Sequence, residues 1–544
     1  VRTSTQAVFS VRDAIADVLG LEPSTIRVVA EDVGGGFGAK GAAYPEEVLV
    51  ALAALRLRRP VRWIGTRTED GMTTNQSHGT VFDLELAADA DGRLRGVRGR
   101  VLHDIGAYAG VGVGQAGNQI THMLSAYGLP SMGVEILPLY TNTAPTGFIR
   151  GGGREMGNLA MERLIDRMAD EIGLERHELR RRNVLRPEQL PYEPGLRAGP
   201  VPVRFDFGDV PAMLETVIGY LGKERLGVEG STARGAGVVC FAESTGFGQR
   251  EPARMVIGAD GWVSVSVGST PQGQGHQTMV AQIVATRLGW PMDRVRVVAG
   301  DTAAISHGFN TAGSRSAVHV GNAAAGVSRE ARHRVLELAG DRLEADAADL
   351  ELDGGVVQVR GAPTRRIAVS DVVPDDGLEV VTEFTPDQAT TWVGGCQGLV
   401  VEVDLETGRT DVVRSILAHD SGLLINPTIA EGQIHGGLAH GIGYALFESA
   451  AYEPDATMRA PSFLDYSIVS APEMAVRLDL EHVETPSTAT PEGFRGIGES
   501  GTIPVPAAVC SAVEDALRRA GRPVRIEELP ITPERLLGLM AQRP

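Results

Sequence analysis

The sequence predicts an α+β protein built from two blocks that each mix strands and helices. Three observations carry this prediction. Short apolar runs of strand length alternate with longer stretches whose apolar residues recur at helical spacing. A proline-rich segment, 191–230, separates a first block, 1–190, from a second, 231–544. The 544 residues are 43% hydrophobic and 22% charged, which is typical of a globular chain with more than one domain.

In the first block, apolar runs predict strands at 26–30, 60–65, 81–87 and 94–103. Helices are expected at 45–57, 158–172 and 177–183. The first helix has acidic residues in its first turn and an arginine near its end, as the helix dipole favours. Asn158 is the expected N-cap of the second helix, whose apolar residues share one face.

The second block continues the alternation. Strands are expected at 236–243, 255–258, 262–268, 295–299, 398–404 and 411–418. The expected helices lie at 278–288, 322–338, 429–447 and 506–519. The last helix begins at Pro506 and is followed by Gly521, and both residues are typical helix boundaries.

Net charge and cysteine content limit the classes of function and the cellular compartments that fit this chain. Lys and Arg number 51 and Asp and Glu 69, so the net charge is −18, and the chain repels nucleic acids and anionic membranes. No apolar run reaches the ~18 residues of a membrane span. The three cysteines, Cys240, Cys396 and Cys510, are too few to hold an iron–sulfur cluster with four thiolates. We expect the protein to be located in a reducing compartment, the cytoplasm. The periplasm, which is oxidising, is the alternative location.

Glycine is over-represented and clusters in short motifs. There are 68 glycines among 544 residues, about 12%, whereas glycine makes up roughly 7% of an average protein. The first motif, GGGFGAK at 34–40, lies between an expected strand and helix, where backbone N–H groups can hold an anion. The acid of a dinucleotide fingerprint is absent, and Gly41 replaces the Ser or Thr of a P-loop. A plain tight turn remains an equal alternative.

Three further motifs combine polar side chains with glycine. RGGGR at 150–154 can hold an oxyanion or a phosphate between two arginines. TPQGQGH at 270–276 presents amide groups that can bind a polar heterocycle or an oxo group. TAGSRS at 311–316 offers hydroxyls and one arginine to a phosphate. Taken singly, each is also consistent with an ordinary loop, a polar turn or a helix cap.

The fifth motif, GIGESGT at 496–502, places a single acid among glycines before an expected helix. Glycines let other groups approach the carboxylate of Glu499 closely. If Glu499 is buried, its pKa is raised and it suits general-base catalysis near neutral pH. The alternative is a solvated surface glutamate. Zinc catalysis is a poor interpretation, because His435 and His440 are five residues apart and do not share a helix face.

The motifs occur together and in order within longer stretches: TQAVFSVRDAIADVLG, IRVVAEDVGGGFGAKG, RGGGREMGNLAMERLIDRMADEIG, GSTPQGQGHQT, INPTIAEGQIHGGLAHGIG and GIGESG. This combination resembles the molybdenum-binding large subunit of the xanthine dehydrogenase/aldehyde oxidase family, the molybdenum hydroxylases. The resemblance extends from Ser4 to about Ala520. It implies two elongated mixed domains, 1–190 and 231–544, with a molybdopterin cofactor between them and a linker at 191–230.

The resemblance implies an activity and assigns residues to it. The activity is oxidative hydroxylation of an electron-poor carbon of an N-heterocycle or aldehyde, with water as the oxygen source. Glu499 and Arg150 are the expected catalytic residues, with Glu499 as the base and Arg150 facing the metal site. The pterin dithiolene holds the molybdenum, so no side chain is an expected metal ligand. The expected cofactor contacts are Gly35, Gly36, Phe37, Gly38, Arg150, Gly151, Gln272, Gly273, Gln274, His276, Thr311, Gly313, Ser314, Arg315, Gln433, Gly498 and Glu499.

The resemblance also implies partners. The expected cofactor is molybdenum–molybdopterin cytosine dinucleotide. The expected partners are a small subunit with [2Fe-2S] clusters and a medium subunit with FAD, in a dimer of heterotrimers. The family's usual N-terminal region is absent from this sequence, so the first domain is expected to be partial. We expect that region on a separate chain, or this chain to be an incomplete piece.

Three positions depart from known substrate classes of the family. Gly151 stands where carbon monoxide dehydrogenases place a special cysteine, which argues against CO oxidation. Gly152 and Gly41 stand where purine-oxidising members place a stacking Phe and a substrate-binding Glu, which argues against xanthine. A roomier, less polar pocket is expected. Two alternatives remain: an aldehyde oxidoreductase instead of a heterocycle hydroxylase, and a cofactor-free scaffold or assembly chain.

Overall fold

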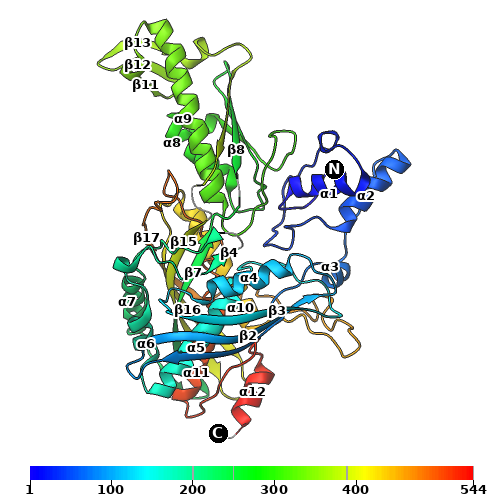
Figure 1. Ribbon diagram of the computed structural model, residues 1–544, viewed down its shortest axis with the longest axis vertical. Coiled ribbons are helices and arrows are strands. Elements are labelled where there is room, and N and C mark those ends of the chain that lie inside the picture. The colour runs from blue at the N-terminus through cyan, green and yellow to red at the C-terminus, as the bar shows by residue number, and fades with distance from the viewer. Residues whose placement is uncertain (199–200, 249, 387–389, 543–544) are drawn as a thin grey trace.

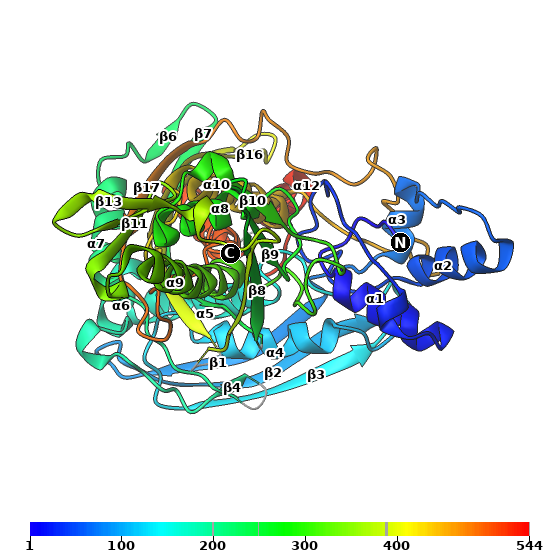
Figure 2. The same cartoon turned by 90° about the horizontal axis from the view of Figure 1, so that it is seen from above.

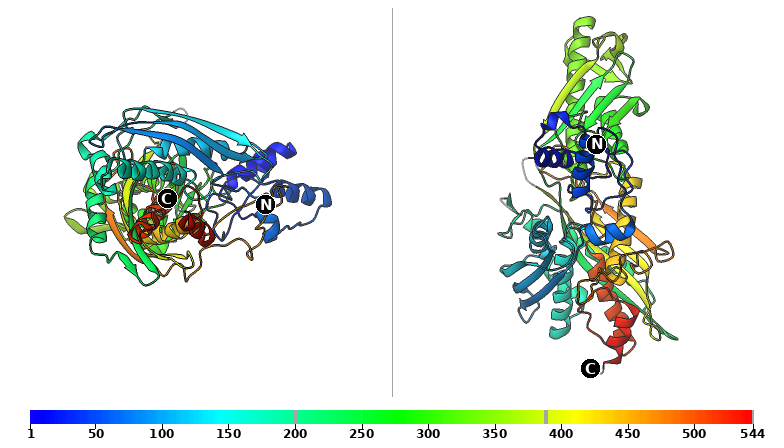
Figure 3. Two further views of the ribbon diagram at one scale, coloured as in Figure 1. Left: turned by 90° about the horizontal axis from the view of Figure 1, so that it is seen from below. Right: turned by 90° about the vertical axis from the view of Figure 1, so that its right-hand side faces the viewer.

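The computed structural model describes residues 1–544 except 199–200, 249, 387–389 and 543–544. It confirms the predicted mixture of helices and strands, in an elongated molecule (Figure 1). The segment between β8 and β14 forms one end, and the C-terminus lies at the other (Figure 3). The N-terminal helices lie to one side between these ends (Figures 1 and 2).

A five-stranded sheet of order β17-β16-β15-β7-β6 forms the centre of the lower part of the molecule. Its strands are β6 (Gly227–Glu229), β7 (Thr232–Thr245), β15 (Thr391–Asp404), β16 (Thr410–Asp420) and β17 (Arg477–Val483). All pairs are antiparallel except β16 with β17. Alternate residues of β7 are buried in its first half and nearly all in its second, so this sheet is covered on both faces where the strand ends.

Helices cover both faces of the central sheet. The helices α10 (Pro427–Leu446) and α11 (Val505–Arg519) pack on one face, with α5 (Arg154–Ile172) against α11. Here Gly237 is needed, since a Cβ would lie 2.5 Å from the carbonyl oxygen of Ala508. The helix α7 (Val210–Leu221) packs on the other face, where a Cβ at Gly398 would lie 2.6 Å from Val217. Small residues therefore let the helices approach the strands closely.

A second sheet, of order β1-β2-β3, flanks the lower part of the molecule (Figure 2). Its strands are β1 (Thr80–Ala88), β2 (Leu94–Gly106) and β3 (Met132–Tyr140). The helices α4 (Gly112–Met123) and α5 pack on it, and the short α6 (Arg176–Asn183) follows α5. This arrangement places the N-terminus of α5 next to the end of β7.

The upper part of the molecule contains a four-stranded sheet of order β10-β9-β8-β14. Its strands are β8 (Glu251–Ile257), β9 (Val263–Val267), β10 (Val295–Val298) and β14 (Leu378–Phe384). The helices α8 (His276–Leu288) and α9 (Ser316–Leu343) pack on it and share its core. A small sheet of β11 (Leu350–Asp353), β12 (Val356–Val359) and β13 (Ala362–Ala368) forms the tip (Figure 1).

The remaining helices are peripheral. They are α1 (Val8–Leu19), α2 (Pro45–Leu57) and α3 (Arg67–Thr73) at the N-terminus and α12 (Pro533–Ala541) at the C-terminus. Among the described residues, no helix is long and apolar enough to cross a membrane. A two-residue ladder pairs β4 (Arg197–Ala198) with β5 (Val201–Pro202).

Several sequence-based boundaries were wrong for physical reasons. In the fully described stretch 26–30, Val29 makes isolated bridges to Arg2 on one side and Asp301 on the other, but no continuous ladder forms. The stretch 60–65, also fully described, is irregular. The helix expected from Asn158 begins at Arg154, since Gly153 takes the left-handed conformation (φ 99°) that ends the preceding loop. The segment 191–230, expected as a linker, contains α7, which is part of the core.

Candidate active site

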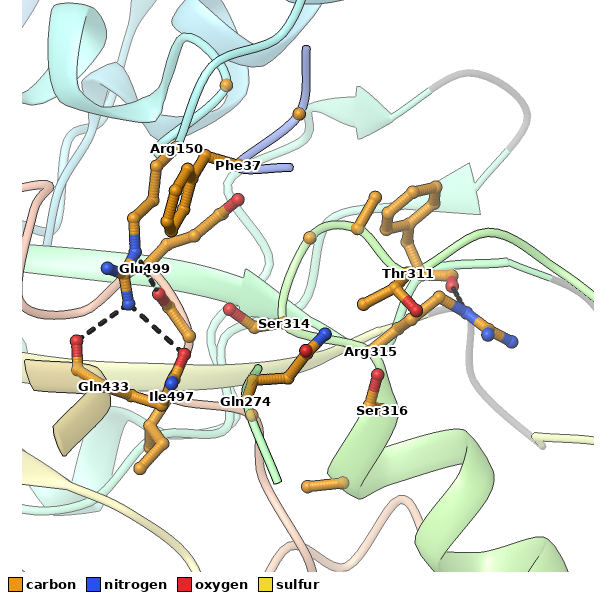
Figure 4. Close-up of a pocket in the computed structure, with 18 of the residues that line it drawn as sticks. Phe37, Arg150, Gln274, Thr311, Ser314, Arg315, Ser316, Gln433, Ile497 and Glu499 are labelled. Atoms are coloured by element: carbon orange, nitrogen blue, oxygen red, sulfur yellow. Dashed lines mark hydrogen bonds between the residues drawn. The ribbon is translucent and has the colours of Figure 1, made fainter. Parts of the chain in front are cut away.

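A cavity of about 1060 Å³ lies where the N-terminal region and both predicted blocks meet. Its walls come from stretches that are far apart in the sequence: 33–38, 148–154, 272–276, 311–317, 421–436 and 495–499. Figure 4 shows Phe37, Arg150 and Glu499 close together in this cavity, and Thr311, Arg315 and Ser316 in another part of it. The five glycine-containing motifs of the sequence therefore converge on one space.

The residues that the sequence assigned to the site line this cavity, with one exception. Gly151 does not line it: a Cβ there would lie 2.1 Å from Oε2 of Glu155. Its neighbour Gly152 lines the cavity instead. The fold thus brings the predicted site residues together around one cavity, and the binding role of each residue stays a prediction.

The loop 34–40 is held by Gln6, a residue that our sequence-based assignment missed. Gln6 Oε1 accepts hydrogen bonds from the backbone N–H groups of Gly38 (2.9 Å) and Lys40 (3.2 Å). Gln6 Nε2 donates to the carbonyl oxygen of Thr311 at 2.6 Å. Gly38 is required, since its φ is +110° and a Cβ would lie 2.5 Å from the oxygen of Phe148. One amide thus joins two walls of the cavity.

Arg150 is a buried cross-link between loops. Its Nε donates to the carbonyl oxygen of Gly498 at 2.7 Å, and its Nη2 donates to that of Gln433 at 2.7 Å (Figure 4). Burial lowers the pKa of Arg150, and the neighbouring Glu499 opposes this effect. Arg150 therefore fixes the backbone beside Glu499, and the ion pair with the Glu499 carboxylate is made by a different arginine.

That arginine is Arg154, in the first turn of α5, which the sequence placed in an anion-binding motif without linking it to Glu499. Its Nη1 donates to Oε2 of Glu499 at 2.8 Å and to the carbonyl oxygen of Gly151 at 3.0 Å. Both side chains of the ion pair are largely buried, with 5% of Arg154 and 13% of Glu499 exposed. The signal was the second arginine of the RGGGR motif. Glu499 is therefore a buried, oriented carboxylate at the cavity wall and not the solvated surface glutamate of the alternative.

A second buried carboxyl group lies beside this pair. Glu243, in β7, is fully buried and accepts hydrogen bonds from the hydroxyls of Ser314 and Ser500. Burial and the neighbouring charge of Glu499 raise the pKa of Glu243 to about 7, against the effect of the two hydroxyls. No sequence motif marked it, because it sits in an ordinary buried strand.

The loops 270–276 and 311–316 form the far part of the cavity. Thr311 Oγ1 donates to the carbonyl oxygen of Thr270 at 2.7 Å, and Gln274 Nε2 donates to Oε1 of Gln272 at 2.9 Å. Arg315 Nη2 donates to Oε2 of Glu251 at 2.8 Å in a fully buried ion pair. Loops that are far apart in the chain thus hold polar groups at fixed places.

The cavity suits a large polar ligand. At about 1060 Å³ it lies at the upper end of the ~300–1,000 Å³ of ordinary small-molecule pockets. Nη1 of Arg315 and Nδ1 of His276, both in its walls, have no hydrogen-bond partner among the described residues. A Cβ built on Gly34, Gly273 or Gly432 would meet nothing within 4 Å. Open glycine backbone and a buried arginine donor fit a phosphorylated ligand.

Comparison with known proteins agrees with this description. Two family models, both described as a molybdopterin cofactor-binding domain, match residues 1–184 and 220–475. The chain is 34% identical to the nicotine 6-hydroxylase large subunit of Paenarthrobacter nicotinovorans, over 98% of this chain and 68% of that one. It is 31% identical to the carbon monoxide dehydrogenase large chain of Hydrogenophaga pseudoflava, over 95% and 68%.

Solved structures give the same result. Quinoline 2-oxidoreductase from Pseudomonas putida 86 superposes with a TM-score of 0.91 at 34% sequence identity. The alignment covers 100% of this chain and 72% of the other. The aldehyde oxidoreductase of Desulfovibrio gigas, at 24% identity and a TM-score of 0.82, shares the fold.

Proposed function

The chain belongs to the molybdenum hydroxylase family, which includes xanthine dehydrogenase, and we propose that it hydroxylates an electron-poor carbon of an aromatic N-heterocycle. The observation that carries the substrate choice is the lining of the cavity that contains Glu499, which includes Gly152 and the aromatic residues Phe37, Phe148 and Phe247. Aromatic side chains pack well against a flat aromatic ring.

The names of relatives support the same substrate class. The nicotine and quinoline proteins are named for N-heterocycles, and each is 34% identical to this chain. A putative xanthine dehydrogenase subunit of Escherichia coli is 29% identical. The glycines at 41 and 152 were expected to disfavour xanthine, and Gly152 lines the cavity with no side chain to stack on a purine.

The residues in the cavity fit a molybdopterin cofactor, and we propose the cytosine dinucleotide form. The loop 34–38 and the amides of Gln272 and Gln274 would hold the pterin. Thr311, Ser314 and Arg315 would hold the phosphates and nucleotide, and Nη1 of Arg315 has no hydrogen-bond partner within the described part of the chain. The volume of about 1060 Å³ supports the dinucleotide form, since it lies at the upper end of the range of small-molecule pockets.

The cofactor, when bound, supplies the oxidation–reduction chemistry by which two electrons leave the substrate carbon. Glu499 accepts a proton during the reaction, as a general base. Arg154 orients this carboxylate through the 2.8 Å ion pair and stabilises its charge. Arg150 keeps the backbone of Gly498 in place and so fixes the position of Glu499 in the cavity. The ring of Phe37, at the cavity and half exposed, offers a face to an aromatic substrate.

We propose that electrons leave through partner subunits that carry [2Fe-2S] clusters and FAD. The three cysteines of this chain are separate in the sequence and buried, and the described residues contain no His/Cys/Asp/Glu group able to hold a metal ion. The relative from Paenarthrobacter nicotinovorans at 32% identity is named as one subunit of a dehydrogenase complex. Free buried cysteines also support a reducing, cytoplasmic location.

The substrate proposal is tested by steady-state kinetics on protein purified with its co-purifying subunits. We expect kcat/KM for quinoline to exceed that for benzaldehyde and for xanthine by ~10-fold or more, because aromatic packing and shape discriminate by that much. Benzaldehyde as the better substrate would identify an aldehyde oxidoreductase. A folded chain that contains no molybdenum and turns over none of the three would support the scaffold alternative.

A further inference from the structure

Glu243 shares a buried pocket with the proposed base but does not touch the cavity. It lies in β7, and its neighbour Ser244 lines the cavity. Ser500 directly follows Glu499, and Ser314 is in the wall formed by 311–317. Each oxygen of the Glu243 carboxyl accepts a hydrogen bond from one serine hydroxyl, so Glu243 joins the loop of Glu499 to the wall formed by 311–317.

The charges around Glu243 are unequal. Among the described residues, no cation hydrogen-bonds to Glu243, whereas Arg154 is committed to Glu499 at 2.8 Å. The charged groups that act on Glu243 are Glu499, which repels its negative charge, and Arg154, which attracts it. Arg150 also lies within electrostatic reach. Two carboxylates in one pocket repel each other. When one carboxyl group loses its proton, its negative charge therefore raises the pKa of the other.

We propose that Glu243 is a positioning residue that acts through Glu499: its two serine contacts fix the loop of Glu499, and its negative charge favours proton transfer to Glu499. The pKa of Glu243, raised to about 7, supports this role, because the group changes charge near neutral pH. Below pH 7 Glu243 is neutral and gives little electrostatic help. Above pH 7 it is ionised, and proton transfer to Glu499 relieves the repulsion between the two carboxylates.

The first test follows the proton on Glu243 and needs no substrate. The protonated-carboxyl infrared band of the purified protein is titrated against pH in wild type and variants. We expect a component with a midpoint near pH 7 that Glu243→Gln removes. Glu499→Gln should lower the midpoint, since it removes a repelling charge, and Ser500→Ala should raise it, since it removes a hydrogen bond to the charged form. Glu379→Gln, an exposed glutamate in β14, is the control.

Two results of this titration would overturn the proposal. One is a component near pH 7 that persists in Glu243→Gln. The other is a midpoint that neither Glu499→Gln nor Ser500→Ala moves. These two variants also keep the test decisive if Glu243→Gln fails to fold.

The second test measures kcat against pH with quinoline, and this part rests on the proposed function. Wild type should gain rate as pH rises through about 7, by ~10-fold or more, because general-base efficiency depends on charge near the base. Glutamine keeps a hydrogen-bonding amide for both serines but carries no charge. Glu243→Gln should therefore fold, keep its molybdenum and lose the rise.

A wild-type pH profile in Glu243→Gln would reduce Glu243 to a structural link and contradict the proposal. Failure to turn over quinoline in wild type would concern the substrate alone, since the infrared titration stands without it.

Discussion

At the scale of single residues, the site depends on which arginine holds which group. Two arginines flank the glycines of RGGGR, and the sequence could not say which one meets Glu499. Arg150 binds backbone carbonyl oxygens, while Arg154 binds the Glu499 carboxylate. The difference arises because Arg154 is already in the first turn of α5, which directs its side chain toward the loop of Glu499.

Replacing Arg154 should therefore impair catalysis more than stability. We expect Arg154→Gln to lower kcat by ~10²-fold or more with molybdenum retained, because an oriented charge beside the base is lost. Arg167→Gln is the matched control in the same helix, since Arg167 pairs with Glu527 at the surface. Equal kcat in Arg154→Gln and the control would remove Arg154 from the mechanism.

The sequence marked Glu499 as a candidate and gave no sign of Glu243, for a physical reason. Glycine motifs mark places where backbone approaches a ligand, and such places are visible in a sequence. Glu243 is one acid in a buried strand, and only the pairing of β7 with its neighbours places it beside Ser314 and Ser500. Gln6 is similar, because its partner Thr311 is 305 residues away.

At the scale of elements, local signals predicted helices better than strands. The helix expected at 45–57 is confirmed with the same bounds, because proline and acidic residues at its start are local signals. The described stretch 60–65 forms no strand, and 26–30 makes only isolated bridges at Val29, because a strand needs continuous pairing with a partner that the sequence does not name. Long-range pairing thus limits the prediction.

The junction of α5 and α6 is a buried ion network that also anchors the helix carrying Arg154. Arg180 Nη1 donates to Asp166 at 2.8 Å and Nη2 to Glu162 at 2.5 Å, and all three side chains are at most 1% exposed. Tyr127 donates to the other oxygen of Glu162 at 2.6 Å. Removing the arginine would leave buried carboxylates without their main cation.

We expect Arg180→Met to destabilise the protein by ~3–5 kcal/mol, the usual cost of breaking a buried ion pair on one side. Arg181→Met is the control in the next position, where Arg181 is 40% exposed and pairs with Glu178 and Glu215. It should cost about 1 kcal/mol or less. Urea denaturation of both variants checks this. A similar loss of unfolding free energy in both variants would show that the buried network contributes no more than a surface ion pair.

At the scale of the whole molecule, the site exists only because distant segments meet. Its walls combine the N-terminal region, the start of α5, loops beside the upper sheet and the loop before α11. Gln6 and Arg150 are two of the cross-links between these walls. The family's motif order let the sequence predict this convergence, whereas the contacts themselves required the three-dimensional arrangement.

In the proposed mechanism, Glu499 is the base of a cofactor-loaded cavity. The most direct test measures molybdenum per chain and kcat with quinoline on the same preparations of wild type and Glu499→Gln. We predict equal molybdenum and a fall in kcat of ~10²–10⁴-fold, since a general base is lost while the cavity is kept. Equal molybdenum with undiminished kcat would contradict the account.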